Sequence, residues 1–234
     1  MDTIIIGASG KKQSGKNTLC DFLKTFIPKN WNARLIKEYS LADALKEKVC
    51  IDVMGLSRKQ CYGSNKDKDS FTSYKWQNLP DQIRCANALK TEKVRMAGHP
   101  GEFADLPVLR KGRMTAREIM QVVGTDVFRK YFDNDIWVNA TLRKIKQDKS
   151  SIALISDVRF PGEVEGVVKN RGHIIRLLRD VCEVDTHESE SALDDFDFEG
   201  TKNCFVIDNK EMSIGQQNAA TIPIIDNIFG RVVI

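Results

Sequence analysis

A glycine-rich segment close to the amino terminus constrains this chain more than any other feature. Residues 10–16 read Gly-Lys-Lys-Gln-Ser-Gly-Lys, between an apolar run at 3–7 and an amphipathic helical pattern at 18–26. A strand, a glycine loop and a helix in this order form the context that a phosphate-binding loop requires. Glycines let the backbone wrap around a polyphosphate, so that successive N–H groups point inward at the start of a helix. The segment therefore predicts a polyphosphate site built on a strand–loop–helix unit.

The end of this loop indicates which side chains contact the phosphates and their metal. Lys16 is placed to reach the β and γ phosphates. Asn17 stands where Ser or Thr usually binds magnesium, and Thr18 comes next. The order Gly-Lys-x-Thr resembles the loop of nucleoside monophosphate kinases such as adenylate kinase. We therefore assign the Mg²⁺-binding hydroxyl to Thr18.

Composition limits the class of protein. The chain has 234 residues and a formal net charge of +4, with 36 basic residues spread among 32 acidic ones. This length buries the core of one α/β domain, and the mild positive charge fits phosphate-bearing ligands. Because the basic residues are not concentrated, no direct nucleic-acid binding is expected. Six scattered cysteines without a Cys-x-x-Cys pair indicate reduced thiols and a cytoplasmic location.

No apolar run approaches membrane-spanning length, so no membrane association is expected. A secretory signal peptide is not expected either, since the first apolar run leads straight into the glycine loop.

Strand-like and helix-like segments alternate along the chain. The predicted strands lie at 3–9, 34–38, 152–155, 173–178 and 204–207, and the predicted helices lie at 16–27, 42–54, 115–124, 136–147 and 162–170. Pro28 and Asn30 are expected to end the first helix, and Ser40 to cap the second. The alternation predicts an α/β fold with a parallel sheet covered by helices on both faces. The resemblance of the glycine loop to that of nucleoside monophosphate kinases implies that this is the three-layer sandwich of P-loop kinase type.

Residues 63–113 differ from the rest. They are rich in glycine, proline and charged residues, and no hydrophobic period continues across them. A structureless loop of this length is unusual, so we expect a small hairpin or short helix within it. We interpret the chain as a single domain, 1–234, in which 63–113 is an insertion that covers the substrate cleft.

A second group of chemically informative residues follows the strand at 152–155. Asp157 and Arg159 come at its carboxyl end, and Glu163 lies one turn further on. Ligands of α/β proteins bind at this edge of the sheet. Asp157 is placed to orient Mg²⁺ or its waters, or to contact substrate, and Arg159 to hold a phosphate through two hydrogen bonds. The alternative is a surface Asp–Arg pair at an ordinary strand end, and the glycine loop favours the functional interpretation.

The helix that begins at Thr115 presents a third group. Thr115 and Glu118 have the spacing of a capping box. Arg117, Gln121 and either Gly124 or Thr125 then lie on one helical face, an arrangement suited to a phosphate and a base edge.

Trp137 is a candidate for stacking on the base, although a tryptophan in a helix more often belongs to the core.

The polar segment 185–190 follows Arg176 and Arg179. A lid here would bring cations to a phosphoryl group in transfer. With Lys11 and Lys12, these arginines are candidates for a charge clamp.

These motifs occur in one order along the chain. They are Gly-x-x-x-x-Gly-Lys-x-Thr at 10–18 and the blocks 115–129, 135–138, 157–163, 185–190 and 207–209. In this the sequence resembles the deoxynucleoside monophosphate kinases of tailed bacteriophages, from the first strand to about residue 209 but weakly over 63–113. The resemblance implies transfer of the γ-phosphoryl group of ATP, with Mg²⁺, to the 5′-phosphate of a deoxynucleoside monophosphate (dNMP). It also implies small nucleotides as partners, a homodimer, and the host cytoplasm if the chain is of phage origin.

The residue assignments combine the motifs with this resemblance. The predicted catalytic residues are Lys16, Asp157 and Arg159. The predicted ATP-binding residues are Gly10, Lys12, Ser14, Gly15, Lys16, Asn17 and Thr18, with Thr18 as metal ligand. The predicted substrate-binding residues are Lys68, Arg117, Gln121, Gly124, Thr125, Trp137, Asp157, Arg159 and Glu163. Asn17 stands where family members often have Asp.

Two alternatives remain at the level of sequence. One is another small-molecule P-loop kinase, of the dephospho-coenzyme-A or phosphomevalonate kinase type, because such enzymes share the loop and can share the Asp-x-Arg strand end. The other is a nucleotide-dependent DNA-binding ATPase, which ranks lower because no basic stripe is present. The bases accepted are not determined by the sequence.

Overall fold

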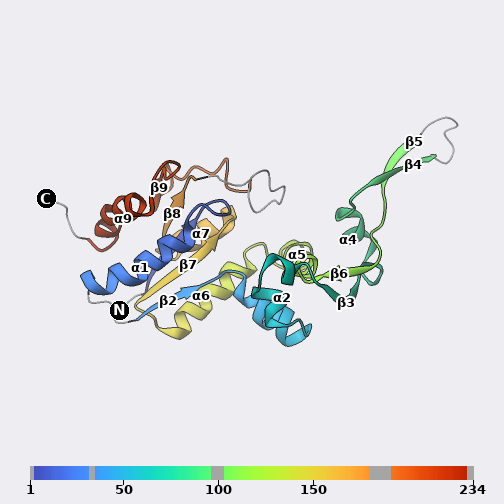
Figure 1. Ribbon diagram of the computed structural model, residues 1–234, viewed down its shortest axis with the longest axis horizontal. Coiled ribbons are helices and arrows are strands. Elements are labelled where there is room, and N and C mark those ends of the chain that lie inside the picture. Colours follow the sequence, from blue (N-terminus) through green and yellow to red (C-terminus); the bar gives the residue numbers. More distant parts are fainter. Residues whose placement is uncertain (1–2, 32–34, 96–102, 180–190, 231–234) are drawn as a thin grey trace. The chain divides into compact units, whose positions relative to one another are not determined.

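The computed structural model describes residues 3–31, 35–95, 103–179 and 191–230 (Figure 1). The chain divides into two compact units. Unit 1 comprises Met1–Ala44 and Asn134–Ile234, and unit 2 comprises Leu45–Asp133.

Unit 1 is built on a five-stranded sheet in the order β2-β7-β1-β8-β9, in which every pairing is parallel. The strands are β1 (Ile4–Ser9), β2 (Ile36–Tyr39), β7 (Ile152–Val158), β8 (His173–Leu177) and β9 (Cys204–Ile207). Each corresponds to a strand predicted from the sequence, and the predicted α/β class is confirmed. β2 is displaced by one or two residues from its expected position at 34–38.

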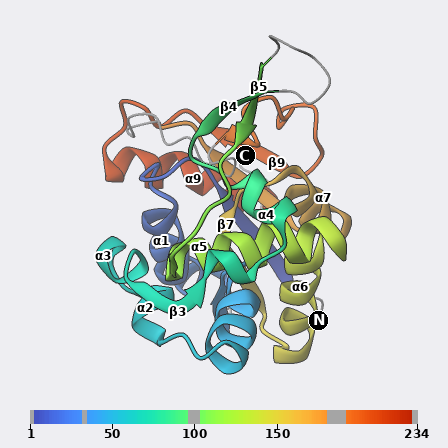
Figure 2. The ribbon, with the colours of Figure 1, turned by 90° about the vertical axis from the view of Figure 1, so that its right-hand side faces the viewer.

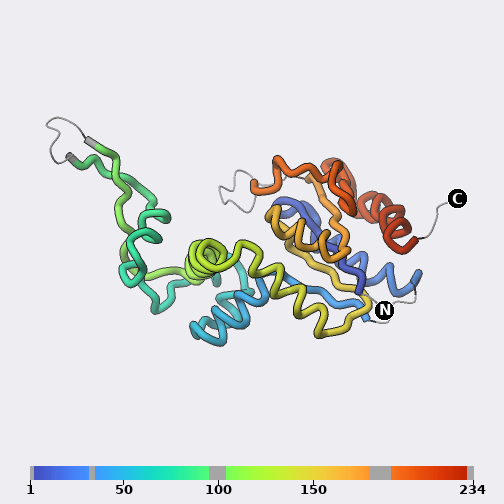
Figure 3. The backbone as a smooth tube through the Cα atoms, turned by 180° about the vertical axis from the view of Figure 1, so that it is seen from behind, coloured from blue at the N-terminus to red at the C-terminus, as the bar shows by residue number. Residues whose placement is uncertain are grey.

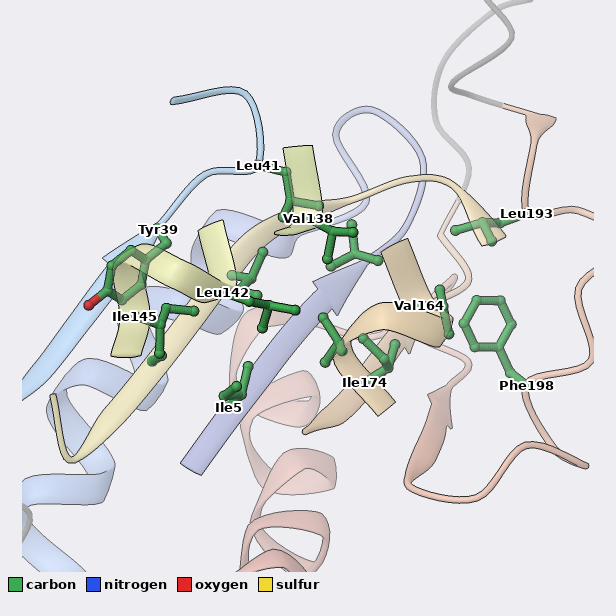
Figure 4. Packing of buried hydrophobic residues seen from close by; sticks show 14 residues of the cluster. Ile5, Tyr39, Leu41, Val138, Leu142, Ile145, Val164, Ile174, Leu193 and Phe198 are labelled. Atoms are coloured by element: carbon green, nitrogen blue, oxygen red, sulfur yellow. The ribbon is translucent and has the colours of Figure 1, made fainter. Parts of the chain in front are cut away.

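Helices cover both faces of this sheet. Residues of α1 (Lys16–Trp31) and α9 (Ile214–Ile228) share one apolar cluster with the sheet, whereas α6 (Ile136–Asp148) and α7 (Pro161–Lys169) share the other. The path of the chain from β1 to α9 can be followed from blue to red in Figure 3. In Figure 4, Ile5 and Ile174 from the sheet lie among Val138, Leu142 and Val164 of the helices. The result is the predicted three-layer sandwich.

The order of the strands determines where ligands can bind. From β1 the chain passes to β2 on one side, returns to β7 next to β1, and then crosses to β8 on the other side of β1. A reversal of this kind leaves a crevice at the carboxyl ends of the central strands. The glycine loop leaves β1 at this point.

The first helix is longer than the sequence predicted. Pro28 and Asn30 were expected to end it, but α1 continues through both to Trp31. Leu23 and Ile27 are fully buried on its inner face, and Trp31 packs against the ring of Phe229 at 5.1 Å between centroids. Asn30 donates its side-chain N–H to the carbonyl of Phe26 at 2.8 Å. This packing, with the extra hydrogen bond, offsets the roughly 3 kcal/mol that a proline costs inside a helix.

Unit 2 consists of short elements (Figure 2). They are η1 (Ala44–Val53), α2 (Arg58–Tyr62), α3 (Asn65–Lys68), β3 (Phe71–Lys75), η2 (Trp76–Asn78), α4 (Asp81–Ala86), β4 (Thr91–Arg95), β5 (Phe103–Pro107), β6 (Arg113–Thr115), α5 (Ala116–Gln121) and η3 (Val122–Arg129). β4 and β5 form an antiparallel hairpin, and β3 pairs with β6. The predicted hairpin and short helix within 63–113 are thus present. That 63–113 covers a substrate cleft stays a prediction.

The helix that begins after Thr115 does not end near Gly124, as the sequence suggested. It continues as the π-type helix η3 to Arg129. A Cβ atom at position 124 would lie 2.7 Å from Cδ2 of Leu45, so the absent side chain permits close packing there. The glycine therefore serves packing between helices rather than helix termination.

The described cysteines are free thiols. Burial raises the pKa of Cys20 and of Cys50 to about 12, so both are protonated and unreactive at neutral pH. In the part of the chain that the structure describes, no helix is long and apolar enough to cross a membrane.

Candidate active site

The loop between β1 and α1 is the cradle in which the sequence predicts phosphate binding, and its backbone is unusual at three positions. Gly10 and Gly15 have φ values of 151° and 101°, which side chains rarely adopt, and Gln13 is left-handed at 62°. A Cβ atom on Gly10 would lie 2.9 Å from the carbonyl oxygen of Leu177, and one on Gly15 would lie 2.8 Å from Oε1 of Gln217. Both glycines are therefore required by backbone conformation and by close packing behind the loop.

Two predicted ATP-site side chains are buried within this loop. The Nζ atom of Lys16 donates to the carbonyl oxygens of Gly10 and Lys11, both at 2.6 Å, and the residue is only 8% exposed. The hydroxyl of Ser14 is buried and has no hydrogen-bond partner in the described parts of the chain. A buried hydroxyl without a partner is costly, so its presence in the cradle fits a phosphate oxygen as acceptor.

The remaining loop residues differ in exposure. Lys12 and Thr18 are half-buried, and Asn17 is exposed. Thr18 lies in the first turn of α1, two positions after Lys16.

Positive charge borders the loop on the β8 side. Arg176 pairs in register with Ser9 and donates to its hydroxyl at 3.1 Å. Lys11 lies 3.4 Å from a carboxylate oxygen of Asp194, and Arg176 lies 3.8 Å from the other. These two members of the predicted charge clamp thus share one carboxylate beside the loop.

The other predicted arginine of the clamp has a different environment. The guanidinium of Arg179 donates to the backbone carbonyls of Asn209 and Met212. It therefore stabilises the loop that follows β9. The predicted lid at 185–190 lies outside the described residues.

Asp157 connects the ends of two parallel strands. It accepts hydrogen bonds from the Ser40 hydroxyl at 2.6 Å and from the Leu41 N–H at 2.8 Å. The Ser40 hydroxyl also accepts from the Ala42 N–H at 3.2 Å. Because η1 begins at Ala44 and not at Ala42 as predicted, Ser40 orders the turn before this helix. The carboxylate thus lies at the expected edge of the sheet and fixes the chain where it leaves β2.

Glu163 and Arg159 lie next to this point. Glu163 is 4% exposed and accepts the backbone N–H groups of Arg159 at 2.7 Å and Phe160 at 3.1 Å. A carboxylate in this position satisfies amides at the start of α7 and interacts favourably with the helix dipole. The carboxylate of Glu163 therefore fixes the backbone of Arg159, whose side chain is half-buried.

Trp137 lies in α6 and is 7% exposed. This burial is what a core tryptophan shows; its stacking on a base stays a prediction.

The predicted substrate residues of unit 2 form a second group. Arg117 donates to Asp69 at 2.7 Å and to Asn65 at 3.0 Å. Burial, followed by the charges of Lys46 and Arg117, lowers the pKa of Lys68. The charges of two further cations therefore act on Lys68, and one of these, Lys46, was not selected in the sequence analysis. Lys46 lies one helical turn before Cys50, which is buried. In the sequence this spacing indicates only how a helix packs, and it does not indicate a ligand contact.

The helix that contains Arg117 continues from α5 into η3. In it, Gln121 and Thr125 are half-buried, and Gly124 is buried. Within unit 1 the structure thus brings together the glycine loop, Arg176 and the strand-end residues at one edge of the sheet. Within unit 2 it brings Arg117 close to α3.

A parallel sheet covered by helices, with a glycine loop after its central strand and a lysine closing that loop, defines a P-loop kinase-like α/β protein. Comparison with known families identifies it more closely. The family model described as deoxynucleotide monophosphate kinase matches residues 72–213, more than half of the chain. The chain belongs to the deoxynucleotide monophosphate kinase family and is thereby a phosphotransferase, which confirms the family predicted from the motifs.

A curated viral protein is similar over most of its length. It is described as "Putative deoxynucleotide monophosphate kinase" and comes from Acanthamoeba polyphaga mimivirus. The two sequences are 28% identical over 205 residues, which cover 81% of this chain and 82% of the viral protein. A bacteriophage origin of this chain stays a prediction.

Proposed function

We propose that this protein transfers the γ-phosphoryl group of ATP to the 5′-phosphate of a deoxynucleoside monophosphate, giving ADP and a deoxynucleoside diphosphate. The observation that carries the proposal is the glycine loop of unit 1. Its backbone is shaped as a cradle, with Lys16 across it and, inside it, the Ser14 hydroxyl, which has no hydrogen-bond partner among the described residues. In a chain of the deoxynucleotide monophosphate kinase family, such a cradle is suited to hold the triphosphate donor.

The reaction asks little covalent chemistry of the protein. The acceptor is already an oxyanion, so no strong general base is needed. The protein must align two anions and place positive charge around the migrating group. In this proposal Lys16 moves from the carbonyls of Gly10 and Lys11 to the donor phosphates, and Arg176 and Lys11 supply further charge beside them.

The proposed acceptor residues are described for each unit by itself. In unit 1, Arg159 holds the acceptor phosphate, and Glu163 keeps the backbone of Arg159 in place. Asp157 acts there by fixing the Ser40–Leu41 turn. In unit 2, Lys68 and Arg117 supply positive charge for an anionic substrate, and Gln121 and Thr125 contact the nucleoside.

The residues of the loop also fit a magnesium ion bound together with the donor. Within the described residues, no group of three or more His, Cys, Asp or Glu side chains is arranged to hold a metal by itself. Mg²⁺ in nucleotide sites needs few protein ligands, because the phosphates and waters supply the others. The ion would neutralise charge on the phosphates, and Thr18, in the first turn of α1, is the hydroxyl that we propose as its ligand.

The proposal is tested by ADP release from ATP with Mg²⁺ and each deoxynucleoside monophosphate in turn. We expect ADP to appear with at least one of these acceptors and only slowly without an acceptor, since closure of a kinase site suppresses hydrolysis. Dephospho-coenzyme A and phosphomevalonate serve as comparison acceptors. Turnover with one of these and with no dNMP would replace the proposed substrate.

A further inference from the structure

Two side-chain amides lie behind the glycine loop, although neither belongs to it. Asn209 follows β9 and is fully buried, and Gln217 lies in the first turns of α9 and is 2% exposed. Asn209 Nδ2 donates to the carbonyl of Ser14 at 2.8 Å and to Gln217 Oε1 at 2.7 Å. Gln217 Nε2 lies 3.4 Å from the carbonyl of Gly15. Two consecutive carbonyls of the cradle are thus contacted by amides from the opposite end of the chain.

A third contact fixes the orientation of the Asn209 side-chain amide. Its Oδ1 accepts the backbone N–H of Arg179 at 2.8 Å, and the Arg179 side chain donates to the backbone carbonyl of Asn209. Rotation of the amide by a half-turn would place its oxygen against the Ser14 carbonyl and its nitrogen against the Arg179 N–H. The network therefore accepts only a residue that donates toward Ser14 and accepts from Arg179.

The geometry of the peptide unit links these contacts to the phosphate side of the loop. In a planar trans peptide the C=O and N–H point in opposite directions. Where the Ser14 carbonyl is held toward Asn209, the N–H of Gly15 is directed away from it. The Gly15 carbonyl accepts the N–H of Leu19 at 3.0 Å in the first turn of α1, and Gln217 is a second donor to it at 3.4 Å. With the carbonyl held by these two donors, the N–H of Lys16 is directed away from them. Amides aimed in this way before a ligand arrives need no reorganisation when charge develops.

We propose that Asn209 and Gln217 are positioning residues of the donor site: they orient the Ser14–Gly15 and Gly15–Lys16 peptide units so that their N–H groups face the donor phosphates. This inference rests on the proposed use of the cradle for a triphosphate. It assigns to the loop after β9 and to α9 a role in phosphate binding that is separate from holding the sheet together.

The chain offers a matched control within the same helix. Thr221 is fully buried one turn after Gln217 and donates to the carbonyl of Gln217 at 2.8 Å. This hydrogen bond stays within α9 and does not involve the loop. Removal of this hydroxyl therefore perturbs the packing of α9 without removing an amide contact to the cradle.

The experiment compares Asn209→Asp, Asn209→Ala, Gln217→Ala and Thr221→Ala in the full-length protein. Aspartate keeps the size of asparagine and its acceptor for Arg179 but loses the donor to Ser14. We expect Asn209→Asp and Asn209→Ala to lower kcat/KM for ATP by about 10–100-fold, because a buried carbonyl of the loop loses its hydrogen-bond donor, with Gln217→Ala at the lower end. KM for the dNMP should change by less than about twofold, because the lost interaction concerns the donor phosphates.

A readout that does not depend on turnover separates this inference from the proposed function. Inorganic tripolyphosphate and ADP, each with Mg²⁺, are titrated by calorimetry. We expect the Asn209 variants to lose affinity for both by the factor seen in kcat/KM, and Thr221→Ala to lose none. If the wild type binds tripolyphosphate but phosphorylates no dNMP, the proposed function fails while the positioning role is still tested.

Two results would overturn the inference. If affinity for tripolyphosphate follows the melting temperature in all four variants, Thr221→Ala included, Asn209 and Gln217 act only through stability and the inference is overturned. Should the Asn209 variants not fold, Gln217→Ala decides the matter through the amide ¹⁵N and ¹H shifts of Gly15 and Lys16. Unchanged shifts of both amides in free and ADP-bound protein would overturn the proposal.

Discussion

The two units of this protein are stabilised in different ways. Both large apolar clusters belong to unit 1, where long helices pack on a parallel sheet. Unit 2 has helices as short as four and five residues. Most of the large apolar side chains that are exposed in the described chain lie there, among them Val53, Phe71, Leu89, Tyr131 and Phe132. Unit 1 thus has the features of a rigid scaffold, and unit 2 those of a region with low local stability.

Local interactions stabilise the short elements of unit 2. Capping boxes begin α2, α3 and α5. The guanidinium of Arg110 lies over the ring of Trp76, 4.0 Å from its centroid, and also pairs with Glu118. Helices of this length are marginal alone, so caps and a few such contacts must supply their order. The comparison teaches that the proposed donor site is built on the rigid unit, whereas several proposed acceptor residues lie on the less stable one.

The largest effect is expected from a substitution in the proposed donor site of unit 1. Lys16→Ala should lower kcat by about a thousandfold or more, because the loop loses the cation that neutralises the transferring phosphoryl group. Its melting temperature should stay close to that of the wild type. Turnover is measured by ADP release, with Lys24→Ala as the control, since Lys24 lies on the same helix and pairs with Asp21 and Glu38 at the surface. Near-normal kcat in Lys16→Ala contradicts the assignment of the loop.

A smaller effect should separate the acceptor side of unit 1 from its donor side. Arg159→Ala is expected to raise KM for the dNMP, or to lower kcat, by about 10–100-fold, while ATP affinity changes little. Steady-state kinetics with each substrate varied in turn measures the difference. Lys169→Ala, at the exposed far end of α7, is the control. An effect confined to ATP affinity moves Arg159 to the donor site.

The acceptor residues of unit 2 should show a pH dependence. The pKa of Lys68 is lowered by burial and by Lys46 and Arg117, whereas a phosphate dianion beside it would raise the pKa again. Above the pKa of the free protein, binding must take up a proton, so KM for the dNMP should rise with pH. In Lys68→Arg this rise should disappear, because a guanidinium does not titrate in this range.

The control for Lys68 is Lys66, which lies on the same short helix, α3. Lys68→Met should raise KM by about tenfold at neutral pH, the loss of one charge-assisted hydrogen bond, and exposed Lys66→Met should not. A KM that responds equally to both substitutions, or that has the same pH profile in wild type and Lys68→Arg, places the phosphate elsewhere.

The smallest predicted effect concerns the stability of the two units. Thr115→Ala removes the capping box of α5 in unit 2, and Ser213→Ala removes that of α9 in unit 1. Each should cost about 1 kcal/mol. Hydrogen exchange should show faster exchange throughout unit 2 for Thr115→Ala but only at the start of α9 for Ser213→Ala. If faster exchange extended equally far from the substituted residue in both variants, the two units would differ less in folding cooperativity than their packing indicates.

Much of this architecture follows from local patterns. Apolar runs and capping spacings identify the strands of unit 1 and the start of α5, because such signals extend over a few residues. The glycine loop is recognisable from the sequence because its φ values and lack of space require glycine at positions 10 and 15. Local rules failed at Pro28 and Gly124, where packing of Trp31 and Leu45 outweighs the preference of the residue itself.

The sequence by itself thus determined the sandwich, the family, and the position of the glycine loop that Lys16 closes. Only the tertiary structure decided the contacts of polar groups that lie far apart in the chain: that Asp157 binds the Ser40–Leu41 turn, and that Asn209 holds Ser14. Asn209 and Ser14 are 195 positions apart in the chain. Periodicity and backbone preference are encoded over a few neighbouring residues, whereas the partner of a buried amide is set by the folding of distant segments against one another.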